Sequence, residues 1–108
     1  MKLPTEIFGD VVVIHTPEEV GSDSAAQLER LLTSQERSNV VVDLDGSESI
    51  DSIGLEALLG AQEALRALHG DLKICTSNSA NRKILEMTRL DQQLEVFNTV
   101  VDAVKSFA

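Results

Sequence analysis

The chain has 108 residues, which fits one domain with a single modest hydrophobic core, so we expect one domain over residues 1–108. Hydrophobic residues make up 43% and charged residues 25%, as in ordinary globular proteins, and the formal net charge is −9. Nucleic acids and anionic membranes attract basic proteins, so this charge argues against direct binding to nucleic acid. The acidity indicates either general solubility or a basic protein partner.

Several kinds of site lack the residues that they need. No apolar run approaches the ~20 residues of a membrane span, and the first residues contain no apolar signal segment, which predicts a cytoplasmic protein without membrane insertion. The single cysteine, Cys75, lies in an apolar run and is expected to be a buried structural thiol. His15 and His69 have no metal ligands at the usual spacing, so surface or capping roles are expected. We therefore expect no metal, no cofactor, no catalytic residue and no enzymatic activity.

The N-terminal third of the chain predicts a β-hairpin and then a helix. Two apolar runs at residues 6–8 and 11–14 flank a Gly-Asp turn signal. Residues 16–22 are expected to form a loop, because they contain proline and glycine. A helix should then run to about Ser34, with one of three polar residues as its N-cap: Ser22, Asp23 or Ser24.

The middle of the chain predicts a buried strand followed by a long helix. Residues 40–44 are apolar towards both faces, as in a central strand covered by helices. Residues 52–69 carry apolar side chains at helical spacing, Leu68 included, and Gly70 is well placed to end the helix. The polar residues Asp51 and Ser52 lie where this helix should begin.

The last third predicts a strand at residues 72–75, a helix at 80–87, a strand at 94–97 and a helix opened by Thr99. Val101 belongs to the expected apolar stripe of that last helix. Strands that alternate with helices indicate βαβ units, so the predicted fold is α/β: a mixed, mostly parallel β-sheet with an N-terminal hairpin strand and about four α-helices. A helix that follows a parallel strand begins at the carboxyl edge of the sheet, where ligands and partners usually dock.

Two readings of Asp51-Ser52 follow from this position. Ser52 either caps the helix by accepting a backbone N–H, or it is an exposed hydroxyl that a kinase phosphorylates. Asp51 is either a first-turn or capping acid, or a group that recognises a partner. Asp43 and Asp45 resemble the strand-end acids of phospho-accepting receiver domains, but the acid pair and the lysine that receivers also need are not found.

The stretch VVVDLDGSESIDSIGLEALLGAQEAL, residues 40–65, resembles the signature of the STAS domain, named for sulfate transporters and anti-sigma factor antagonists. The family pattern is a hydrophobic strand, a short loop, and then an Asp-Ser-x-Gly-Leu motif that opens a helix. The matching residues are Asp51, Ser52, Gly54 and Leu55. The resemblance extends from about Ile7 to Phe107 and includes the alternating β/α order.

Stand-alone members of this family are anti-sigma factor antagonists of bacterial partner-switching systems. The resemblance implies that the unphosphorylated chain binds an anti-sigma factor serine kinase, that phosphorylation of Ser52 ends the complex, and that a PP2C-type phosphatase restores it. It also implies that Asp51 is the neighbouring recognition acid and that Gly54 permits close backbone approach at the helix start.

The sequence departs from the switching pattern at two places. Ile53 stands where many switching members carry Ser or Thr. In the second motif, usually Gly-Glu-Leu-Asp, Glu19 fits but Gly21 replaces the acid, and Asp23 is a candidate substitute. We expect the partner surface to include Asp51, Ile53, Gly54, Glu19 and Asp23. The alternative is a non-switching STAS subunit of a transporter-associated (lipid or anion) or signalling scaffold complex.

Overall fold

The structure is a computed structural model that describes residues 2–107. Its main sheet has five strands in the order β1-β2-β4-β6-β7, and only β1 runs antiparallel to its neighbour. The strands are β1 (Thr5–Phe8), β2 (Val11–His15), β4 (Asn39–Asp43), β6 (Asp71–Cys75) and β7 (Val96–Phe97). The predicted mixed, mostly parallel sheet with an N-terminal hairpin strand is therefore confirmed.

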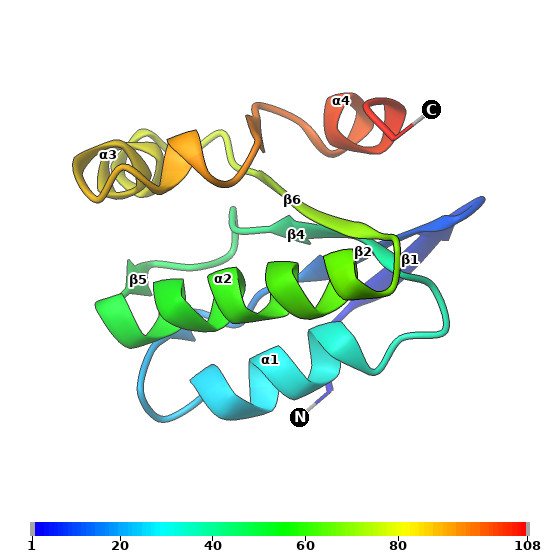
Figure 1. Cartoon of the computed structure of the whole chain (residues 1–108). Coiled ribbons are helices and arrows are strands. Elements are labelled where there is room, and N and C mark those ends of the chain that lie inside the picture. The colour runs from blue at the N-terminus through cyan, green and yellow to red at the C-terminus, as the bar shows by residue number, and fades with distance from the viewer. Residues whose placement is uncertain (1, 108) are drawn as a thin grey trace.

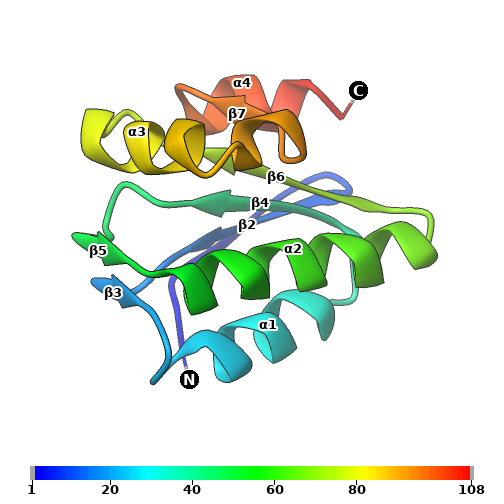
Figure 2. The ribbon, with the colours of Figure 1, turned by 60° about the vertical axis from the view of Figure 1, so that its left-hand side comes forward.

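Four α-helices cover the sheet, as expected. Their bounds are α1 (Ala25–Thr33), α2 (Ser52–Ala67), α3 (Ser79–Met87) and α4 (Val100–Lys105), and a short 3-10 helix, η1 (Leu90–Gln92), follows α3. Helices α1 and α2 lie side by side under one face of the sheet, and α4 lies on the opposite face (Figure 1, Figure 2). The core is accordingly divided into two clusters. The larger joins the sheet to α1, α2 and α3, and the smaller lies under α4. No helix among residues 2–107 combines the length and apolar character that a membrane crossing requires.

A second, two-stranded sheet was not expected from the sequence. Its strands β3 (Glu19–Val20) and β5 (Ser49–Ile50) pair in parallel, with Glu19 opposite Ser49 and Val20 opposite Ile50. The prediction that residues 16–22 form only a loop is therefore wrong. Because β3 follows β2 and β5 follows β4, this small sheet extends the carboxyl edge of the main sheet towards the start of α2 (Figure 2).

The end of α2 also differs from the expectation. The helix ends at Ala67, and the residue that adopts the left-handed conformation after it is His69, with φ of 66°, instead of Gly70. Leu68 lies beyond the helix and is 60% exposed, so its expected inward position is wrong. Gly70 serves close packing, since a Cβ there would collide with the carbonyl oxygen of Ser38.

The C-terminal elements are shorter than their apolar patterns indicated. Strand β7 contains only the second half of the expected 94–97 strand, whereas Leu94 is buried in the core without being part of it. In α4 the buried residue is Ala103, and Val101 is 59% exposed. Helix α4 has six residues and therefore spans less than two turns, so only part of its expected apolar stripe packs against the core.

Candidate functional site

The start of α2 is built around Asp51 and Ser52. Asp51 is the N-cap, and its Oδ1 accepts the backbone N–H of Gly54 at 2.9 Å. Ser52 is the first helical residue, is exposed, and its hydroxyl takes part in none of the hydrogen bonds found among residues 2–107. The capping interpretation of Ser52 is therefore wrong, because Asp51 already satisfies the end of the helix. The exposed hydroxyl can be reached by another protein.

Gly54 brings the first turn of α2 against strand β3. A Cβ at this position would collide with the carbonyl oxygen of Val20 and lie 2.8 Å from its carbonyl carbon. The same carbonyl accepts the N–H of Asp51 at 3.0 Å. The close backbone approach implied for Gly54 is thus present, and it fixes the helix start against β3.

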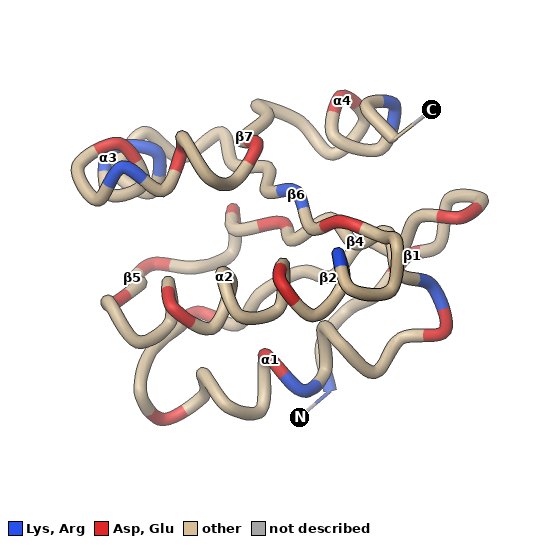
Figure 3. The backbone as a smooth tube through the Cα atoms, viewed as in Figure 1, with Lys and Arg blue, Asp and Glu red and all other residues tan. Residues whose placement is uncertain are grey.

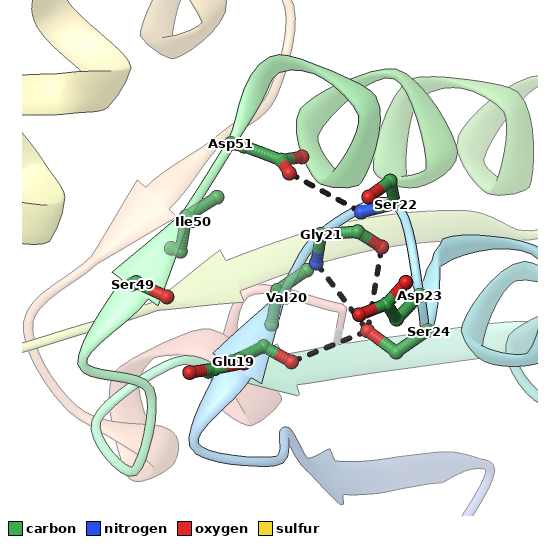
Figure 4. A pocket seen from close by; sticks show the side chains of 9 residues that line it. All are labelled: Glu19, Val20, Gly21, Ser22, Asp23, Ser24, Ser49, Ile50 and Asp51. Carbon is green, nitrogen blue, oxygen red and sulfur yellow. Dashed lines mark hydrogen bonds between the residues drawn. The ribbon is translucent and has the colours of Figure 1, made fainter.

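The segment between β3 and α1, residues 21–24, lies beside Asp51 (Figure 4). Asp51 Oδ2 accepts the backbone N–H of Ser22 at 3.2 Å. Ser24 occupies the N-cap position of α1, but its hydroxyl accepts the N–H of Gly21 at 3.3 Å and donates to the carbonyl of Glu19 at 3.2 Å. Of the three residues expected as N-cap of α1, Ser24 occupies the N-cap position, but its side chain accepts no hydrogen bond from the N–H groups of α1. Its hydroxyl instead closes the 21–24 segment on itself.

The predicted partner residues gather around one shallow depression. Its lining comes from β3, the 21–24 segment, β5 and Asp51, and includes Glu19 and Asp23 (Figure 4). Glu19, Asp23 and Asp51 are all exposed. Ile53, one residue after Ser52, is 48% exposed and adds an apolar contact point. The structure therefore assembles residues that are about 30 positions apart in the sequence into one surface.

The surface around this depression carries acidic side chains, and the segments that form it contain no Lys or Arg. The sequence contains no Lys or Arg between residues 3 and 29 or between residues 38 and 65. Acidic positions mark both the β5 end of α2 and the beginning of α1 (Figure 3). A partner with basic groups is favoured here, and added negative charge would be poorly compensated.

A cluster that sequence spacing could not reveal lies beside this edge. His15 is hydrogen-bonded through Nδ1 to Asp43 Oδ2 (2.7 Å) and through Nε2 to Glu6 Oε1 (2.6 Å). Burial lowers the pKa of His15, but the hydrogen bonds and charges of Glu6 and Asp43 outweigh burial and raise the pKa above its ordinary value. The expected surface or capping role of His15 is corrected: it joins β1, β2 and β4.

The two strand-end acids serve the fold. Asp43 pairs with His15, as described, while Asp45 Oδ1 accepts from Ser77 N–H (2.6 Å) and from the Thr76 hydroxyl (3.0 Å). Burial raises the pKa of Asp45, yet the bonds from Ser77 and Thr76 together hold it below its usual value. Both acids tie loops together, which gives no support to a receiver-like role. No cluster of three potential metal ligands occurs within residues 2–107.

Cys75 is buried, as predicted from its apolar run. Burial, together with the charges of Asp43 and Asp45, raises the pKa of its thiol to about 12. A thiol in this state is a poor nucleophile at neutral pH, so Cys75 is a structural residue.

A protein-family model that matches nearly the whole chain identifies the family of this protein. The model of the STAS domain aligns with residues 2–103. The chain belongs to the STAS domain family. No curated protein is similar enough to match it. The four helices and the mostly parallel five-stranded sheet match the STAS fold.

Several solved structures share the fold of this chain. An anti-sigma factor antagonist from Mycobacterium paratuberculosis is 24% identical, with a TM-score of 0.84 over 97% of this chain and 92% of its own. The phosphorylated form of the Bacillus cell fate determinant SpoIIAA is 17% identical, with a TM-score of 0.72 over 99% and 100% of the two chains. A sulfate transporter family protein from Wolinella succinogenes is 18% identical, with a TM-score of 0.77 over 94% and 87%. At these identities the similarity establishes the fold alone.

Proposed function

We propose that this STAS domain is an anti-sigma factor antagonist that is switched at Ser52. The observation that carries the proposal is the exposed, unbonded Ser52 hydroxyl in the first turn of α2, next to the Asp51 cap and the acidic depression. Unphosphorylated, the chain binds an anti-sigma factor serine kinase through Glu19, Asp23, Asp51 and Ile53, while Gly54, predicted as a partner residue, is buried and only holds the start of α2 against β3. Its role is binding and not catalysis.

Phosphorylation then ends the complex. The kinase transfers the γ-phosphoryl group of ATP to Ser52 Oγ: the new O–P bond replaces the bridging P–O bond, ADP leaves, and the hydroxyl proton passes to a base of the kinase. The phosphate adds a charge of about −1.5 to −2. It stands between Asp51 and the exposed apolar Ile53, where repulsion from the carboxylate and the cost of desolvating the phosphate oppose an interface that closes over the free hydroxyl. A PP2C-type phosphatase hydrolyses the ester and restores the hydroxyl.

Two of the structurally similar proteins support this role. The Mycobacterium protein is described as an anti-sigma factor antagonist, and SpoIIAA has been solved in a phosphorylated form. The experiment is incubation with an anti-sigma factor serine kinase of the same organism and ATP, followed by mapping of the phosphate by mass spectrometry. We expect phosphate on Ser52 and none in Ser52→Ala. Ser79→Ala is the matched control, because Ser79 is likewise the exposed first residue of a helix, α3, but lies outside the depression and should leave phosphorylation unchanged.

A second candidate function is that of a non-switching STAS subunit of a transporter-associated complex, in which Ser52 does not pass through a cycle of phosphorylation and dephosphorylation. It is favoured by the exposed apolar side chain of Ile53 in the Asp-Ser motif and by the similarity to a sulfate transporter family protein. Affinity purification distinguishes the two functions. Recovery of a permease or transporter ATPase, with no anti-sigma factor kinase and no phosphate on Ser52, would favour the second.

A further inference from the structure

The Asp51 carboxylate joins two segments that are distant in the sequence. One oxygen, Oδ1, holds the N–H of Gly54 within α2 at 2.9 Å, and the other, Oδ2, holds the N–H of Ser22 at 3.2 Å. The bond to Ser22 is the longer one and lies at an exposed residue. It is therefore the weaker of the two and the first to break when the carboxylate is disturbed.

The bond to Ser22 depends on the glycine at position 21. A Cβ built on Gly21 would lie 2.6 Å from Asp51 Oδ2 and 3.1 Å from its Cγ. A side chain at this position would therefore occupy the space in which the carboxylate lies. The absence of an acid at position 21, which departs from the switching motif, leaves room for Asp51 to reach the 21–24 segment itself.

We propose that Asp51 is a positioning residue for the 21–24 segment, and that a phosphate on Ser52 acts by driving the Asp51 carboxylate away from Ser22. The proposal rests on the proposed function, since it explains how modification of Ser52 reaches the rest of the partner surface. Asp23 lies in this segment and Glu19 is tied to it through Ser24. When the bond from Ser22 is lost, the segment that carries Asp23 loses its hydrogen bond to the start of α2 and keeps only its own internal bonds and the bond to Glu19.

Two forces act on Asp51 in the same direction. The phosphate and the carboxylate are on adjacent residues and repel each other, with no Lys or Arg in residues 3–29 or 38–65 to compensate. The phosphate also competes with Asp51 for the free N–H groups at the start of α2, which attract anions. Gly21 has no side chain that would hold Oδ2 in place, so only the hydrogen bond from Ser22 keeps this oxygen against the 21–24 segment.

The test is the backbone amide of Ser22, observed by NMR in the full chain with phosphoserine installed at position 52 during synthesis, so that no kinase is needed. Loss of one hydrogen bond predicts roughly twofold to tenfold faster hydrogen exchange at Ser22, together with a shift of its amide resonance. Gly21→Ala should reproduce this change without any phosphate, because the new methyl group displaces only the flexible end of Asp51. Asp51→Asn has one carbonyl oxygen and can keep only one of the two bonds.

Gly46→Ala is the matched control, since its nearest neighbouring atom, the Thr16 carbonyl oxygen, is at 3.4 Å and Asp51 is not involved. Ser22 should be unchanged in this variant, and phosphoserine should add little to Gly21→Ala. An unchanged Ser22 amide in the phosphoserine protein would overturn the inference, even if partner binding were lost and the proposed function stood. A changed Ser22 amide in a protein that binds no anti-sigma factor would keep the inference and refute the proposed function.

Discussion

Two glycines of α2 give opposite predictions when each is replaced by alanine. At Gly54, the new Cβ would meet the main chain of β3, at Val20, which cannot move aside without breaking the Asp51 N–H bond to the Val20 carbonyl. At Gly60, the nearest atom would be Glu29 Oε1 at 2.8 Å, which is the end of a flexible side chain. The first substitution should strain the start of the helix, whereas the second should be accommodated.

The free energies follow from three contributions. Overpacking costs about 1–3 kcal/mol and the loss of one backbone hydrogen bond about 0.5–1.5 kcal/mol, while alanine regains up to about 1 kcal/mol of helix propensity. Gly54→Ala should therefore lower the free energy of unfolding by about 1–3 kcal/mol, which corresponds to at least ~4 °C in Tm. Gly60→Ala should leave stability unchanged or raise it by up to about 1 kcal/mol.

Urea denaturation of both variants beside the unsubstituted protein measures the difference directly. Equal slopes with different midpoints would assign the change to stability and not to the unfolded state. If the two variants agreed within about 0.5 kcal/mol, the close approach of α2 to β3 would not be a constraint on the fold. The position of the Asp-Ser motif against β3 would then need another explanation.

Three further outcomes are expected. The raised pKa of His15 means that its bridge to Glu6 and Asp43 stabilises the fold while the imidazole is protonated, and that this stabilisation is lost as pH rises from 6.5 through the raised pKa. The difference in unfolding midpoint between the protein and His15→Gln should therefore shrink as pH rises above 6.5, and a constant difference would contradict this. Cys75, buried and with a pKa of about 12, should react with a thiol reagent at pH 8 only after unfolding in urea, and rapid reaction of the native protein would contradict its burial. Asn78 caps α3 by accepting from Ala80 and Asn81, so Asn78→Ala should cost about 1 kcal/mol in thermal or urea unfolding, and no cost would mean that the cap is dispensable.

Long elements with a clear hydrophobic period could be predicted from the sequence. The central strand and α2 follow from local apolar patterns, because burial of one face or both requires those patterns. The hairpin follows from its Gly-Asp turn signal, since all four residues of β1 are exposed. Strands β3 and β5 could not be predicted in this way. Each has two residues, and their pairing depends on contacts between segments 30 positions apart, which local patterns do not contain.

The candidate site was predicted in part. The Asp-Ser motif at a helix start was expected, but two adjacent polar residues are equally suited to capping, so only the structure assigns the cap to Asp51 and leaves Ser52 free. The His15 cluster depends on strand register, since β2 and β4 place His15 opposite Asp43. Register follows from the packed sheet and not from spacing along the chain.

The central claim is that Ser52 is the exposed switch of a binding surface. Titration calorimetry of the anti-sigma factor with the unmodified protein, and with the protein that carries phosphoserine at position 52, tests it most directly. We expect the phosphate to weaken binding by at least about tenfold, or ~1.4 kcal/mol. Ser52→Ala should bind like the unmodified protein. Equal affinity of the phosphorylated and unphosphorylated chains would contradict the account.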